Sequence, residues 1–208
     1  MIKALLLIFD PIATWEEIRR ARRGTVFVLT GYLLPLLVLV SAVTGYGLVH
    51  WGKWQSDVGR LKNFTLGEAV VVEVAQFLAS LGVVFIGAKL LKSLGETFHG
   101  RHTYQQTIST VAYGLSPLFL VRLLDMFPGV PWWVSWAIGI ILSIAVLYHG
   151  VPRMMEPDPS HAFGLYLMGM LLLVLVTALA RFLMGAYLEG KFPKLQAFIS
   201  DVAAQLPF

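Results

Sequence analysis

The chain has 208 residues, of which 57% are hydrophobic and only 13% charged, and its formal net charge is +4. So few charged residues cannot supply the polar surface that a soluble globular domain needs. The composition therefore excludes a soluble domain and indicates a membrane protein. The absence of cysteine excludes disulfides and thiol chemistry.

Residues 1–24 are predicted to form an N-terminal amphipathic segment on the membrane surface. The apolar run at residues 1–9 is too short for a span and no small-residue cleavage site follows it, so we expect it to stay in the mature protein. Asp10 suits the N-cap of a helix over residues 10–23, and Pro11 suits its first position. Its apolar side chains repeat every three residues: Ile12, Trp15, Ile18 and Ala21. We expect this stripe to lie at the lipid headgroup boundary, although a helix that docks on a partner would show the same pattern.

Five apolar stretches follow, each near the roughly 20 residues that a helix needs to cross a bilayer. They lie at residues 25–50, 68–92, 105–127, 132–150 and 162–188. The predicted fold is therefore all-α: a polytopic integral membrane protein with a five-helix transmembrane bundle over residues 25–190, preceded by an interfacial amphipathic helix. Residues 191–208 form a short C-terminal segment, with an amphipathic helix expected at 194–206. The loop at 51–67 is expected to stay in water.

The arrangement of basic residues predicts the orientation of the bundle. Nine lysines and arginines fall on the N-terminal side of the spans, against five on the opposite side. Because basic residues concentrate in cytoplasmic loops, we expect a cytoplasmic N-terminus and a C-terminus on the outer side. If the chain is bacterial, the membrane is the inner (plasma) membrane.

Four charged side chains fall inside the predicted spans: Glu73, Arg122, Asp125 and Arg181. Helix direction places all four in the same outer leaflet, although they come from three helices. One interpretation is a polar binding site or vestibule that opens outward. The other is a set of structural ion pairs, in which Glu73 pairs with Arg122 or Arg181 and Asp125 serves the remaining arginine. Arg122 and Asp125 are also spaced to pair with each other on one helix face.

Signatures of catalysis are weak in this chain, and we expect no enzyme activity, no metal site and no cofactor. Glu96, His99 and His102 lie close together, but in a predicted loop without further ligands. Ser116 follows a glycine in a pattern that is similar to an intramembrane serine protease motif. His149, the only histidine in the spans that would serve as its base, falls at the far end of another helix, beyond hydrogen-bond reach.

Three short motifs resemble the YIP family of Ypt/Rab-interacting membrane proteins, in particular its bacterial members. The first is Asp10-Pro11 followed by Trp15, and the second is the link from Gly95 to Gly100 followed by Tyr104-Gln105. The third is the run from Val111 through Tyr113 and Gly114 to Pro117 inside a span. We interpret Tyr113, Gly114 and Pro117 as a helix-packing and kink motif, in which glycine allows close approach and proline frees a carbonyl.

The resemblance implies a non-enzymatic membrane adaptor or scaffold of YIP-family type. The cytosolic region with which eukaryotic members engage GTPases has no counterpart in the two dozen residues before the first span, so that role is not carried over. The expected partners are membrane lipids and other membrane proteins or further copies of the chain, and nucleic acid is not expected. A small transporter or channel-like protein that uses the outer-leaflet charges is the alternative.

Overall fold

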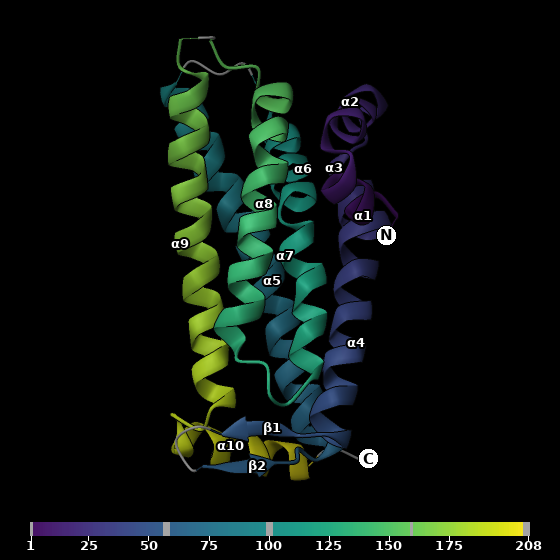
Figure 1. Ribbon diagram of the computed structural model, residues 1–208, viewed down its shortest axis with the longest axis vertical. Helices are drawn as coiled ribbons and strands as arrows, with labels where there is room; N and C mark the ends of the chain where they lie inside the picture. Colours follow the sequence, from purple (N-terminus) through teal and green to yellow (C-terminus); the bar gives the residue numbers. More distant parts are fainter. Residues whose placement is uncertain (1, 56–58, 99–101, 159, 206–208) are drawn as a thin grey trace.

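The computed structural model describes residues 2–55, 59–98, 102–158 and 160–205. Within these ranges, five helical segments are long and apolar enough to cross a membrane, and they stand side by side as one bundle (Figure 1). They are Thr25–His50, Leu66–Thr97, Tyr104–Met126, Trp132–Met155 and Ala162–Leu188. The predicted all-α bundle is confirmed, although the second and fourth helices extend beyond the predicted ends at 92 and 150.

Two of the spans are interrupted near a proline. The first consists of α3 (Thr25–Val28), the π-helical turn η1 (Leu29–Leu33) and α4 (Leu34–His50). The third consists of α6 (Tyr104–Gly114), α7 (Ser116–Val121) and the 3-10 helix η2 (Arg122–Met126). The continuous spans are α5 (Leu66–Thr97), α8 (Trp132–Met155) and α9 (Ala162–Leu188). Proline lacks the N–H that continues the backbone ladder, which explains why the irregular turns adjoin Pro35 and Pro117.

A β-hairpin and a short helix cover one end of the bundle, at the bottom of Figure 1, which we call the hairpin end. Strands β1 (Lys53–Gln55) and β2 (Arg60–Lys62) are antiparallel, and Trp54 pairs with Leu61. Trp54, Arg60 and Leu61 are exposed, whereas the side chains of Lys53 and Gln55 are buried, so the expectation that this loop stays in water remains a prediction. Helix α10 (Pro193–Ala204) confirms the short helix predicted near the C-terminus.

The opposite end carries the N-terminal helices α1 (Ile2–Phe9) and α2 (Pro11–Ala21), and we call it the basic end. The Asp10 carboxylate accepts a hydrogen bond from the Ala13 amide at 3.2 Å, as its N-cap position predicts. The apolar stripe of α2, however, does not face the lipid headgroups as a whole. Trp15 and Ile18 are buried against the bundle, whereas Ile12 remains half exposed. An amphipathic stripe predicts only that the apolar face of a helix is buried, not what buries it. In this chain, the apolar face of α2 packs largely against α8.

Candidate functional site

The buried charges meet near the hairpin end, around the short helix η2. Arg122 of η2 forms an ion pair with Glu73 of α5, and the same nitrogen lies 3.4 Å from the Thr44 hydroxyl of α4. The Glu73 carboxylate also accepts a hydrogen bond from Gln76, one turn along α5, at 3.4 Å. Arg122 and Glu73 are only 4% and 7% exposed, so both charges depend on each other for compensation.

The second ion pair joins η2 to α9. Arg181 donates to the Asp125 carboxylate at 2.6 Å and to the Ser135 hydroxyl of α8 at 3.0 Å. Ser135 in turn donates to the other carboxylate oxygen of Asp125. Helix η2 therefore presents one cation to α4 and α5 and one anion to α8 and α9, and the two ion pairs together carry no net charge.

The pairing expected from depth alone is confirmed: Glu73 takes Arg122, and Asp125 serves Arg181. The third possibility, a pair between Arg122 and Asp125 on one helix face, is wrong. Both residues lie in the 3-10 turn η2, and each side chain instead reaches a different neighbouring helix. Whether these four residues bind a ligand stays a prediction.

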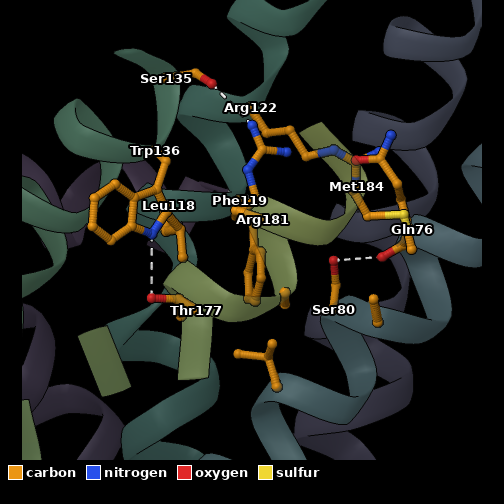
Figure 2. Close-up of a pocket in the computed structure, with 13 residues that line it drawn as sticks. Gln76, Ser80, Leu118, Phe119, Arg122, Ser135, Trp136, Thr177, Arg181 and Met184 are labelled. Carbon is orange, nitrogen blue, oxygen red and sulfur yellow. Dashed lines mark hydrogen bonds between the residues drawn. The ribbon is translucent and has the colours of Figure 1, made fainter. Parts of the chain in front are cut away.

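A small cavity lies between the two ion pairs, and Figure 2 shows the side chains that surround it. Its volume is about 30 Å³, and its polar lining comes from Gln76, Ser80, Arg122, Ser135, Thr177 and Arg181. A water molecule needs at least roughly 10–15 Å³ measured in this way, so the cavity has room for one or two waters. The Nε and Nη1 atoms of Arg122 are buried and donate to no protein acceptor in the described part of the chain.

Lys53 forms buried contacts beside the ion pairs that the sequence did not predict. Its ammonium donates to the backbone carbonyls of Asp125, Phe127 and Val130, at 3.3, 3.4 and 2.8 Å. It therefore binds the carbonyl end of η2 and the turn that follows, where a cation is favoured. Burial lowers the pKa of the Lys53 amine, an effect that the charge of Asp125 opposes. Lys53 comes from a polar loop, and only the fold of the hairpin brings it to η2.

Glu68 is a second residue whose role depends on the hairpin end. It closes a capping box with Thr65 at the start of α5, a pattern that the sequence contains. Its carboxylate also accepts from Lys62 of β2 at 3.2 Å and from Ser200 of α10 at 2.6 Å. One carboxylate thus joins the hairpin, α5 and α10.

Residues from the first and third motifs come together at the basic end. The Trp15 indole donates to the Val146 carbonyl at 2.9 Å, and its ring lies against Gly150, where a side chain would occupy the same space. The Tyr113 ring is 6.4 Å from the Trp15 ring and 4.2 Å from the Tyr32 ring. Three aromatic rings, from α2, η1 and α6, therefore form one cluster.

The second motif joins this region through Gln105, whose amide donates to the Arg23 carbonyl at 3.0 Å. Gly100 of the same motif lies outside the described residues. Each of the three motifs therefore contributes a residue to this group of contacts: Trp15, Gln105 and Tyr113.

Gly114 and Pro117 mark the break between α6 and α7. Gly114 lies in close contact with Leu147 of α8, and a Cβ atom there would overlap that side chain. Pro117 has no N–H for the Tyr113 carbonyl, which instead accepts a hydrogen bond from the Ser116 hydroxyl. The Leu118 amide donates across the helix interface to the Ser143 hydroxyl of α8 at 3.3 Å. The neighbouring helix α8 thus accepts from the Leu118 amide, whereas the Tyr113 carbonyl, freed by Pro117, is satisfied by Ser116 of the same span.

The three residues tested for metal binding do not form a described ligand set, although the His102 ring lies against Gly95, next to Glu96. His99 lies outside the described ranges, and Glu96 lies 3.5 Å from Lys92, one turn earlier in α5. Among residues 2–55, 59–98, 102–158 and 160–205, no three His, Asp or Glu side chains gather as metal ligands would.

The fold and these contacts define a multi-pass helical membrane protein with a buried, internally neutralised ionic network. Residues 5–182 match the family model of the Yip1 domain, so the chain belongs to the Yip1 domain family. Comparisons with curated proteins and with solved structures give no match. The resemblance inferred from the three motifs is confirmed.

Proposed function

We propose that the protein is a non-enzymatic integral membrane adaptor or scaffold that acts through contacts with other proteins or with lipid. The observation that carries this proposal is the pairing of Glu73 with Arg122 and of Asp125 with Arg181. The cavity between Arg122 and Arg181 has a volume of about 30 Å³, and a second cavity beside Asp125 and Lys53 has about 140 Å³. A transport path requires hydrated or exchangeable polar groups along its length, whereas paired charges fix the packing of neighbouring helices.

The absence of catalysis is part of the same proposal. The Ser116 hydroxyl is buried and donates to the Tyr113 carbonyl, so it completes the backbone hydrogen bonding of a broken helix. A nucleophilic hydroxyl would instead donate to a general base.

The basic end is the surface that we assign to the cytoplasm. Lysines and arginines concentrate there: α2 exposes Arg19 and Arg20, and Arg22 and Arg23 follow it, also exposed. Membrane lipids and other membrane proteins, including further copies of the chain, are the proposed partners.

A transporter or channel-like protein is the second candidate, and one observation favours it. Two buried nitrogens of Arg122 donate to no protein acceptor among the described residues, and Arg122 borders the small cavity. A buried cationic donor group beside a cavity is a suitable element of an ion or proton path.

Two measurements on the full chain distinguish the candidates. A photoreactive residue replaces Arg20 at the basic end or, as the matched control, Phe198 of α10 at the hairpin end; both side chains are exposed. An adaptor with a cytoplasmic face should give discrete protein adducts in native membranes from position 20 and not from position 198. In liposomes, it should dissipate a proton or salt gradient no faster than empty vesicles do. A gradient that collapses with the native chain and persists with Arg122→Gln would overturn the proposal in favour of the transporter.

A further inference from the structure

A cleft of about 500 Å³ opens at the basic end, between the C-terminal turn of α2 and the start of α6. Five cations line it, contributed by α1, by α2 and by the turn that follows α2: Lys3, Arg19, Arg20, Arg22 and Arg23. The lining contains one carboxylate, that of Glu156. The volume falls within the range of ligand sites, and the excess of positive charge predicts an anionic occupant.

Part of this charge is already neutralised. Lys3 lies 2.8 Å from Glu17, and Arg19 and Arg20 lie 2.9 and 3.4 Å from Glu16.

The two arginines of the turn after α2 differ from these three. Arg22 and Arg23 form no ion pair with any residue in the described ranges, and the Arg23 guanidinium lies 4.1 Å from the centre of the Phe27 ring. Among the described residues, two guanidinium groups therefore border the cleft with no carboxylate at ion-pair distance, and the charge of Arg23 acts on Glu17 only from beyond that distance. Guanidinium groups bind phosphate oxygens through paired hydrogen bonds, which carboxylate-paired lysines and arginines do less readily.

The opposite wall of the cleft adds further positive potential and polar groups. Thr103, Gln105 and Ser109 line this wall, at the N-terminal turns of the 11-residue helix α6. The N-terminus of a helix carries partial positive charge and favours anions. The hydrogen bond from Gln105 to the Arg23 carbonyl holds the arginine turn against this helix start. The two cationic elements of the cleft are thus fixed relative to each other.

The helices α1 and α3, which contribute Lys3 and Val28 to the cleft, also expose apolar side chains. Helix α1 packs against α6, α7 and α8 through Ala4 and Leu7, while Leu5 and Phe9 remain exposed. Val26 of α3, just beyond the arginine turn, is 74% exposed. A cationic cleft beside exposed apolar helices matches a molecule with an anionic head and apolar chains.

We propose that this cleft binds the phosphate-bearing headgroup of an anionic phospholipid, with the acyl chains along α1 and α3. Arg22 and Arg23 contact the phosphate oxygens, and the start of α6 faces the same group. This proposal deepens the proposed function by naming lipid as a partner at the basic end. Soluble phosphate compounds share the headgroup chemistry, but they would leave the adjoining apolar surface unused.

The test measures lipid binding to the purified full chain in mild detergent by native mass spectrometry. Phosphatidylglycerol and phosphatidylcholine with identical acyl chains serve as the anionic and zwitterionic probes. We expect the native chain to prefer phosphatidylglycerol by about tenfold or more, and Arg22→Gln with Arg23→Gln to remove that preference. Replacing the same two residues with lysine should retain it. The matched control, Arg60→Gln with Lys194→Gln, removes two exposed positive charges at the hairpin end and should have no effect.

Several outcomes overturn the proposal. Equal binding of the two lipids by the native chain does so, and so does an equal loss in the hairpin-end control, which would show a general charge effect. Displacement of phosphatidylglycerol by millimolar inorganic phosphate or glycerol phosphate would assign the cleft to a soluble ligand. If the double glutamine variant does not fold, Arg22→Gln alone carries the test, because the Arg22 side chain is exposed. A failed lipid preference with retained protein adducts from position 20 would remove the headgroup site and leave the adaptor function standing.

Discussion

Arg122 connects the buried charges to the surrounding helices. Its guanidinium bonds Glu73 of α5 and Thr44 of α4, and three residues later Asp125 reaches Arg181 of α9. A charge in such a place is costly without its partner, because the low dielectric of the interior strengthens both the attraction and the penalty for losing it. The ion pairs are therefore a property of the whole packing at this level of the bundle.

The substitution Glu73→Gln should lower the free energy of unfolding by about 3–5 kcal/mol, since it leaves the Arg122 charge buried without compensation. Adding Arg122→Met should recover part of the loss. Thermal unfolding in detergent measures both changes. Glu96→Gln is the matched control, because Glu96 forms an exposed pair with Lys92, and such pairs contribute at most about 1 kcal/mol. Equal effects of Glu73→Gln and Glu96→Gln would contradict a structural role for the buried pair.

We expect Lys53, at the same end of the bundle, to make the free energy of unfolding depend on pH. Burial lowers the pKa of its amine below the ordinary 10.5, a shift that Asp125 and Glu189 oppose and Arg181 increases. As the pH rises toward 10.5, the folded chain therefore loses this proton before the unfolded chain does. Because the unfolded state then binds more protons, the contribution of Lys53 to stability rises with pH. The difference in stability between the native chain and Lys53→Met, measured by unfolding at a series of alkaline pH values, should grow; parallel curves would contradict the shift.

Among the elements, α2 shows how an interfacial helix becomes part of a bundle. Trp15 is fully buried, and its indole N–H bonds the Val146 carbonyl of α8. Gly150 leaves the space that the ring occupies. Helix α2 is therefore fixed to α8 by an aromatic side chain that also meets Tyr113, and its arginines are held above the cleft at the basic end.

Trp15→Ala should destabilise this attachment by about 3–5 kcal/mol, the usual cost of truncating a buried large aromatic residue. We expect faster hydrogen exchange across residues 11–21, because α2 would separate from α8 more often. Ile12→Ala is the control, since Ile12 lies on the same helix and is 52% exposed. Similar exchange in the two variants would mean that lipid contact, rather than Trp15, holds the helix in place.

For the molecule as a whole, the sequence predicts what depends on spacing and depth. Five apolar stretches give five spans, and helix direction places the buried charges at one level, where Glu73 pairs with Arg122 and Asp125 pairs with Arg181. The sequence does not predict that Lys53 binds the end of η2, because that contact depends on how a polar loop folds back. It also does not distinguish lipid from protein as the cover of Trp15, since either produces the same apolar periodicity.

The orientation of the bundle is the last prediction, and it rests on the distribution of charge over the whole chain. Along the sequence, nine lysines and arginines fall on the N-terminal side of the spans and five on the opposite side, so the N-terminal side should face the cytoplasm. A reporter inserted near Gly100 should be cytoplasmic, and one fused after Phe208 should be exposed on the outer side. Both positions lie outside the described residues, but α5, which ends at Thr97, runs from the hairpin end to the basic end, whereas α10 (Pro193–Ala204) lies at the hairpin end (Figure 1). Signals on the same side would contradict five spans, whereas two reversed signals would keep the five spans and invert the protein in its membrane.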